Sequence, residues 1–234
     1  MLFNLLQTDI VEAAEAAPIQ QEMSYSIVDM AVKGGWLMIV LLILSIIAVY
    51  IFGKKLWLIS KAGKIDRNFL MDIRDYLHEG KVKSAKTLCG KFDTPVARMA
   101  EAGLEKCGKS STEIQTAIEN MGNLEIARIE KGLPYLAMIA GGAPMIGFLG
   151  TVMGMVQAFF NMSMAGSNID IALLSGGIYT AMITTVGGLI VGIVAYFGYN
   201  FLTSKVSDLA FRMESATVEM VDILSAEENK TAAE

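Results

Sequence analysis

Long stretches of this chain contain no charged residue. Residues 34–53, 132–169 and 171–204 lack Asp, Glu, Lys and Arg, although 18% of the 234 residues are charged. With 53% hydrophobic residues and a mean hydropathy of +0.48, the composition excludes an ordinary soluble domain. A helix of about 20 residues crosses the roughly 30 Å apolar core of a bilayer. The pattern therefore predicts an all-α integral membrane protein with three transmembrane helices.

Other absences limit the function. The sequence has no P-loop, no GxSxG motif and no metal-ligand spacing, so we expect no enzyme activity, no cofactor and no metal. Its two cysteines, Cys89 and Cys107, are expected to be reduced, and His78 is the single histidine. Basic and acidic residues are interleaved, which gives no reason to expect nucleic-acid binding. The short apolar start MLFNLL has no basic n-region and is not followed by an apolar run long enough for a signal peptide, so no cleaved signal peptide is expected.

The charge pattern divides the chain into seven segments. We expect an N-terminal periplasmic segment (1–33), transmembrane helices at 34–53, 133–160 and 173–199, a cytoplasmic helical insertion (54–132), a short periplasmic loop (161–172) and a cytoplasmic C-terminal helix and tail (200–234). Fifteen of the 19 Lys and Arg residues lie between the first two spans and three follow the last. The positive-inside rule then predicts an N-out, C-in orientation.

The polar parts have helical patterns of their own. Phe69, Ile73 and Leu77 recur at spacing four before Gly80, and Ser110 to Glu113 has the S-x-x-E pattern of a capping box. Beyond the third span, an apolar stripe predicts that the span continues as a helix into the tail. The stripe consists of Leu202, Val206, Leu209, Met213, Ala216, Met220 and Ile223. The pairs Glu125 with Arg128 and Glu105 with Lys109 have helical spacing and are expected to be solvated.

Small residues distinguish the second and third spans from the first. GxxxG motifs occur at Gly150 and Gly154 and at Gly188 and Gly192, with Gly147 one turn before the first motif. Such residues let helices approach closely, and the simpler interpretation is that they only make helix contacts. The alternative is a polar strip, because Thr151, Thr180, Thr184 and Thr185 put hydroxyl groups at membrane depth. Residue types alone leave both interpretations open.

No ionisable residue lies inside any predicted span, since Asp29, Lys33 and Asp170 fall at their outer edges. A proton path across a membrane normally uses an ionisable group. The chain is therefore either not a channel, or it obtains its titrating group from a partner helix.

Two segments resemble a known family. Residues 144–155, PMIGFLGTVMGM, are similar to the LLGTVxGM signature of the MotA/TolQ/ExbB proton-channel family, and residues 177–200 resemble its last span. The resemblance is strongest to the ExbB branch and covers roughly residues 30 to 225; the three-span topology differs from the four-span MotA type.

The resemblance implies a homo-oligomeric ring, expected to be a pentamer, in the bacterial inner membrane. Its second and third spans would surround the helix of an ExbD/TolR-like partner that carries an intramembrane aspartate, and the ring would couple the proton motive force to a TonB-like protein. Thr151 and Thr185 match pore-facing threonines of the family, and Thr180 and Thr184 are weaker candidates. Many relatives have glutamate at the position of Thr180. A TolQ-like or stator role, a non-conducting scaffold, and sodium in place of protons all remain open.

Overall fold

The computed structural model describes residues 34–63, 67–164 and 171–231, and these residues form helices joined by short turns, with no strand among them. The helices are α3 (Trp36–Ala62), α4 (Arg67–His78), α5 (Val82–Cys89), α6 (Pro95–Glu105), α7 (Ser111–Glu130), α8 (Leu133–Met164) and α9 (Ile171–Thr231). Asp29, Lys33 and Asp170, which the sequence placed at the span edges, lie outside the described residues. The prediction of an all-helical protein is confirmed.

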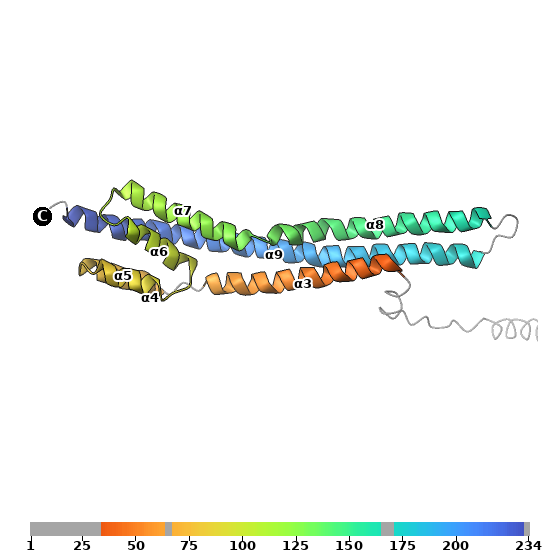
Figure 1. Cartoon of the computed structure of the whole chain (residues 1–234), viewed down its shortest axis with the longest axis horizontal. Coiled ribbons are helices and arrows are strands. Elements are labelled where there is room, and N and C mark those ends of the chain that lie inside the picture. The colour runs from red at the N-terminus through yellow and green to blue at the C-terminus, as the bar shows by residue number, and fades with distance from the viewer. Residues whose placement is uncertain (1–33, 64–66, 165–170, 232–234) are drawn as a thin grey trace, which may run out of the picture.

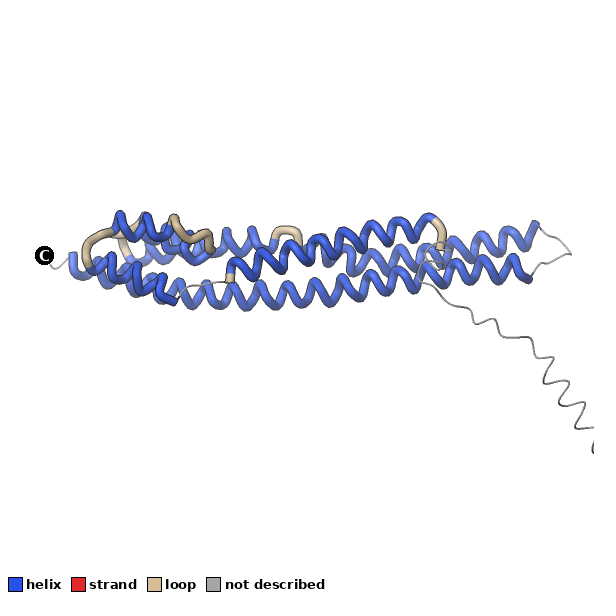
Figure 2. The backbone as a smooth tube through the Cα atoms, turned by 90° about the horizontal axis from the view of Figure 1, so that it is seen from below, coloured by secondary structure: helices blue, strands red, loops and turns tan. Residues whose placement is uncertain are grey.

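The molecule is a long rod built around α9, which runs its whole length (Figure 1). At one end α3 and α8 pack along α9, and at the other end α4 to α7 surround its second half (Figures 1 and 2). The 61 residues of α9 correspond to about 90 Å at 1.5 Å per residue, far more than a bilayer needs. Three helical stretches are long and apolar enough to cross a membrane: α3, residues within the α7–α8 run, and the first part of α9.

Local sequence signals set the ends of the polar helices. Thr94 caps α6 through a hydrogen bond from the Ala97 backbone N–H to its hydroxyl (3.4 Å), and proline follows at the first helical position. Ser110 caps α7 by accepting a bond from the Glu113 N–H (3.4 Å), as the S-x-x-E pattern predicted. Gly80 takes a positive φ of 69° after α4, which only glycine adopts without strain.

Two residues, Lys131 and Gly132, separate α7 from α8. Gly132 has φ 105°, and the two helices continue in nearly the same direction on either side of it (Figure 1). The Lys55 Nζ of α3 donates a hydrogen bond of 2.8 Å to the carbonyl oxygen of Ile129, in the last turn of α7. A lysine at this position satisfies a carbonyl that the helix itself cannot pair, and it ties the first span to the junction.

The polar end has a conventional apolar core. Phe69, Ile73 and Leu77 of α4 are buried as predicted. Six of the seven predicted positions of the α9 stripe are buried as well: Leu202, Val206, Leu209, Met213, Ala216 and Met220. Leu224 is buried at the end of the stripe, where Ile223 is only half-buried. The helical continuation of the last span is confirmed.

Candidate functional site

The contact between α8 and α9 is made by backbone rather than by side chains. A Cβ placed on Gly188 would lie 2.6 Å from the Ala143 carbonyl oxygen and 2.9 Å from the Cα of Gly147. A Cβ on Gly147 would lie 2.9 Å from the Thr184 carbonyl oxygen and 3.1 Å from the Cα of Gly188. Neither position has room for a side chain. The two helices therefore approach as closely as their main chains allow.

The other three predicted packing glycines lie along the same contact. A Cβ on Gly154 would be 2.7 Å from the Cβ of Ala181, and one on Gly192 would be 3.1 Å from the Ala140 carbonyl oxygen. A Cβ on Gly150 would meet the side chain of Thr184 and come within 3.2 Å of Leu37 on α3. Gly150 is thus the place where all three span helices come together.

Two threonine hydroxyls meet across this contact. The Oγ1 of Thr151 on α8 and the Oγ1 of Thr185 on α9 are hydrogen-bonded to each other. The Gly147 carbonyl oxygen lies within hydrogen-bond distance of both hydroxyls, 3.3 Å from Thr151 and 3.1 Å from Thr185, and the Ala181 carbonyl oxygen lies 3.3 Å from that of Thr151. Because each hydroxyl has one proton, these carbonyls are alternative acceptors for it. Both side chains are half-buried. The result is a small polar site of two hydroxyls and two carbonyls at the edge of the interface.

Thr184 and Thr180 have different surroundings. The side chain of Thr184 is 2% exposed and donates to the Ala181 carbonyl at 2.7 Å, on the side where Leu37 of α3 packs. Thr180 is half-buried on α9, one turn before Thr184. Of the four predicted threonines, the structure brings Thr151 and Thr185 together and buries Thr184 inside the protomer.

The hydroxyl site lies among neutral residues. Within the described chain, α8 has no Asp, Glu, His, Lys or Arg, and α9 has none before Lys205. Each hydroxyl can donate one hydrogen bond and accept up to two, and it carries no charge. The site can therefore orient or relay a proton, and it cannot hold the charge of one.

Much of the surface around this site is apolar. Met145, Phe148 and Val152 of α8 and Val186 and Leu189 of α9 are exposed in the single chain. Exposed apolar surface of this extent needs lipid or other protein around it. The membrane end is thus complete only within a bilayer or an assembly.

A cluster of charges at the polar end was not predicted. Glu125 of α7 is only 2% exposed, and its carboxylate oxygens bind the Arg98 Nη2 at 2.6 Å and the Arg128 Nη1 at 2.8 Å. Arg98 also binds Asp93 at 2.7 Å, and Asp93 binds Lys61 at the end of α3 at 2.8 Å. The expected pair of Glu125 with Arg128 forms, but the expectation that it is solvated was wrong for Glu125, because its carboxylate is buried between α6 and α7.

The sequence held a signal for this burial. Ile114, Ile118, Gly122, Glu125 and Ile129 follow one another at spacings of four and three, so Glu125 occupies a core position of α7. The pair expected between Glu105 and Lys109 was also wrong, since α6 ends at Glu105 and Lys109 pairs instead with Glu113 at 3.5 Å.

Hydrogen bonding shifts the acidity of the cluster. The bonds from Lys61 and then from Arg98 hold the pKa of Asp93 below its ordinary value, and the bond to Glu125 raises the pKa of Arg98. The cluster joins the end of α3, the turn before α6, α6 and α7 by fixed charges.

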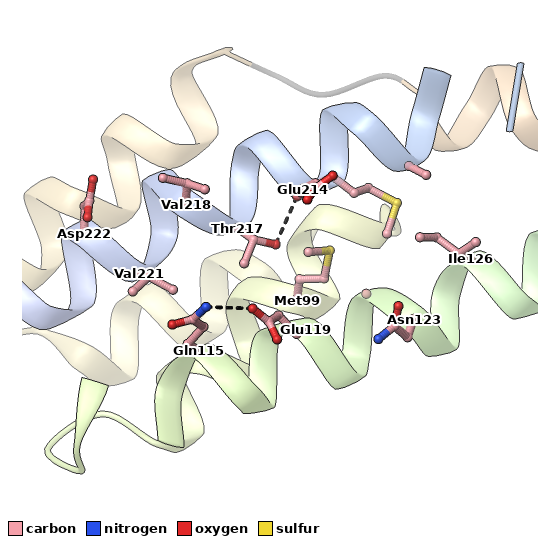
Figure 3. Close-up of a pocket in the computed structure, with 13 residues that line it drawn as sticks. Met99, Gln115, Glu119, Asn123, Ile126, Glu214, Thr217, Val218, Val221 and Asp222 are labelled. Carbon is pink, nitrogen blue, oxygen red and sulfur yellow. Dashed lines mark hydrogen bonds between the residues drawn. The ribbon is translucent and has the colours of Figure 1, made fainter. Parts of the chain in front are cut away.

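A groove of about 670 Å³ lies between α7 and α9 at the polar end (Figure 3). Gln115 and Glu119 of α7 face Thr217 and Val221 of α9 across it, with Met99 of α6 between the helices. Its polar contacts are internal, such as the 2.8 Å bond from Gln115 to Glu119. Among the described residues, no group of three His, Cys, Asp or Glu side chains could hold a metal ion.

Comparison with known proteins connects the threonine site to a family. The sequence profile of the MotA/TolQ/ExbB proton channel family matches residues 91–215. The chain is 30% identical over 180 residues to the putative biopolymer transport protein ExbB-like 1 of Synechocystis sp., covering 76% of this chain and 71% of the relative. The chain belongs to the MotA/TolQ/ExbB proton channel family.

Two further relatives in this family match to different extents. The putative biopolymer transport protein ExbB homolog of Methanothermobacter thermautotrophicus is 28% identical over 193 residues, covering 81% of this chain and 67% of the relative. The Tol-Pal system protein TolQ of Haemophilus influenzae is 38% identical over 85 residues, 36% of this chain and 37% of the relative. The family resemblance expected from the sequence is confirmed. Both the ExbB and the TolQ branches are represented.

The family match covers both ends of the rod. It begins at Lys91 and ends at Ser215, so it includes α6, α7, α8 and most of α9. The threonine pair, the packing glycines and the Arg98–Glu125 ion pair all lie within it. MotA/TolQ/ExbB proteins form a membrane channel family, and the three apolar helices of this chain agree with that membrane location.

Proposed function

We propose that this protein is the ring-forming subunit of an inner-membrane proton channel, and that Thr151 and Thr185 face its pore. The observation that carries the proposal is the hydroxyl pair itself, at the edge of the α8–α9 contact, where the described parts of the two helices have no Asp, Glu, His, Lys or Arg before Lys205. The exposed apolar faces of α8 and α9 support the ring, since they need neighbours. A homopentamer is the assembly that the family resemblance implies.

The proposed pore needs a titrating group from outside the chain. Hydroxyls and carbonyls can orient a proton but cannot carry its charge, and intramembrane proton relays use acids or histidine. An ExbD/TolR-like partner would supply an aspartate from its own transmembrane helix. Thr151 and Thr185 would then donate hydrogen bonds to that carboxylate when it is ionised and accept one when it is protonated.

The buried position of Thr184 sharpens the pore assignment. Its hydroxyl already bonds within α9, and its side chain is closed off by Gly150 and Leu37. We assign Thr184 to packing within the protomer and keep Thr180, which is half-buried, as a further pore residue. The five glycines would hold α8 and α9 close enough for the hydroxyls to meet.

The orientation follows from charge. Fifteen Lys and Arg residues lie between the first and second spans, which supports an N-out, C-in chain with α4 to α7 and the end of α9 in the cytoplasm. The rod would then carry pore motion to a cytoplasmic bundle through the unbroken helix α9.

The proposal extends to the physiological role of the channel. Relatives named biopolymer transport protein ExbB support a channel that drives TonB-dependent transport across the outer membrane. A relative named Tol-Pal system protein TolQ supports an envelope role in its place. A stator-type channel and a non-conducting scaffold are the remaining alternatives. The flux experiment below separates the scaffold from all three channels.

The test is proton flux through the full chain reconstituted with an ExbD-like partner. Thr151→Val and Thr185→Val keep the side-chain shape and remove the hydroxyl. Thr151→Ser and Thr185→Ser keep the hydroxyl and remove the methyl group. Loss of one net hydrogen bond, about 1 kcal/mol, predicts roughly a fivefold lower flux in each valine variant. Rings of normal size and wild-type flux in both valine variants would overturn the pore assignment.

A further inference from the structure

A second concave site lies on the membrane part of the rod, between α3 and α9. It has a volume of about 380 Å³ and is bounded by Ser45, Ala48, Val49, Phe52, Ala195 and Phe201, among others. Small residues hollow it out, and the rings of Phe52 and Phe201 stand 6.4 Å apart at one end. Its lining is almost wholly apolar, apart from the hydroxyl of Ser45.

A cation stands just beyond the aromatic end of this groove. Lys205 is the first charged residue of α9 after the uncharged stretch 171–204, and its Nζ lies 5.8 Å from the centre of the Phe201 ring. Gly198 lines the groove, and Lys205 follows it seven residues later on α9. At about 100° per residue, the two residues therefore point in directions about 20° apart around the helix. Among the described residues, no carboxylate forms an ion pair with Lys205.

The two lysines of α3 near the groove point elsewhere. Lys54 lies about 160° around α3 from Phe52 and its Nζ is 5.9 Å from the ring of Tyr50. Lys55 is buried and donates to the Ile129 carbonyl. Lys205 therefore lies beyond the aromatic end of the groove and on the same side of α9, where the lipid headgroups would begin.

The groove and the threonine pair lie on different sides of α9. Thr185 and Gly198 are 13 residues apart on α9, so at about 100° per residue they point in directions about 140° apart around the helix. If Thr185 faces the pore, which is the proposed function, the groove faces away from it toward the bilayer. This step rests on that proposal. It favours a lipid over a second copy of the chain as the occupant.

We propose that this groove holds an acyl chain of an anionic phospholipid, with the lipid phosphate bound by Lys205. The apolar walls match the chain, and the unpaired ammonium matches the charge of the headgroup. The groove runs along α3 and α9 toward Lys205, so the tail lies in the hydrocarbon layer and the phosphate at its surface. The lipid fills the space between the first span and the pore helix.

The experiment is native mass spectrometry of the full-length protein, purified in detergent, stripped of lipid and titrated with phosphatidylglycerol or phosphatidylcholine of identical acyl chains. The wild-type protein is expected to retain phosphatidylglycerol several-fold better. Lys205→Gln is expected to abolish this preference while chain binding persists. Ser45→Phe fills the groove and is expected to lower the binding of both lipids several-fold.

Matched variants separate the groove from general effects. Lys54→Gln removes a lysine at the same depth, and Ile43→Phe adds a ring about 180° around α3 from Phe52; both are expected to bind like wild type. Wild-type lipid binding in Lys205→Gln and Ser45→Phe would overturn the proposal. A change of oligomer size in Ser45→Phe without lipid loss would overturn it too, and would make the groove a seat for a neighbouring subunit. Lipid retention is read without proton flux, so it can fail while the pore assignment stands.

Discussion

The two ends of the rod are held together in different ways. At the membrane end α8 and α9 meet backbone to backbone through glycine, with a Cβ position on Gly188 only 2.6 Å from the Ala143 carbonyl oxygen. At the polar end α6, α7 and α9 bury methionine, leucine and isoleucine side chains around the charged group of Glu125. Lipid removes the hydrophobic drive for helix association, whereas water supplies it. Helix α9 takes part in both kinds of packing, through glycine contacts in its first half and through buried side chains in its second half.

The charge cluster gives the largest expected effect at the polar end. Glu125→Ala removes the shared carboxylate and leaves Arg98 and Arg128 facing each other. Breaking a buried ion pair costs roughly 3–5 kcal/mol, and partial exposure of both arginines moves the value toward the lower end. Thermal unfolding of the polar-end helices in detergent, followed by circular dichroism, measures this loss of stability. Glu130→Ala, on the exposed face of the same helix, serves as the control, and equal stability of the two variants would contradict the buried cluster.

A methyl group tests the backbone contact at the membrane end. Gly188→Ala forces a carbon against main-chain atoms, and overpacking of this kind costs about 1–3 kcal/mol. The expected result is weaker α8–α9 association, seen as a lower midpoint in a denaturing-detergent titration. Gly141→Ala on α8 is the matched control, because a Cβ there meets nothing within 4 Å. If both variants shift the midpoint equally, the contact is not as close as described.

Acid should weaken the polar end before the membrane end. The pKa of Asp93 is lowered in the folded chain by Lys61 and then Arg98. Its contribution is therefore complete above the ordinary Asp pKa of about 3.9, and is lost as the pH falls through the lower folded value. Asp93→Asn is expected to differ from wild type by a constant amount between pH 5 and 8, and by less below about pH 4. A difference that grows on acidification would contradict the pairing.

The smallest effect concerns the two thiols of the polar end. Burial raises the pKa of Cys89 to about 11, so little thiolate forms at neutral pH, and Cys107 is only half-buried. Iodoacetamide is expected to label Cys107 well before Cys89 when the folded protein is followed by peptide mass spectrometry. Equal labelling rates in the folded state, with faster labelling of both after unfolding, would show that the α5 packing is looser than described.

Sequence patterns predicted most of the fold because burial in lipid or in a helical core repeats apolar residues at regular positions along the chain. Charge-free windows marked the spans, spacings of three and four marked the buried stripe of α9, and Ser110 marked the start of α7. The break at Gly132 was not predicted, because a glycine with positive φ looks like any other glycine in sequence. Lys55 was counted for orientation, but its bond to Ile129 depends on a contact between residues far apart in the chain.

The sequence predicted which threonines belong to the candidate site, but not which of them contact one another. All four threonines were candidates, and the resemblance to the family favoured Thr151 and Thr185. Only the structure shows that Thr184 turns into the protomer while Thr185, one residue later, meets Thr151. Adjacent helical residues point about 100° apart, so which one faces a neighbour depends on packing. Glu125 was misjudged for a related reason, since its spacing to Arg128 was considered without its place in the buried stripe.

The most direct test of the central claim is proton flux through reconstituted rings with an ExbD-like partner, compared between Thr185→Val and Thr185→Ser. A pore-facing hydroxyl predicts that the serine variant conducts like wild type and that the valine variant conducts roughly fivefold less, with rings of the same size, because only the hydroxyl has been lost. Equal flux in the two variants would contradict the pore-facing role of the threonine pair.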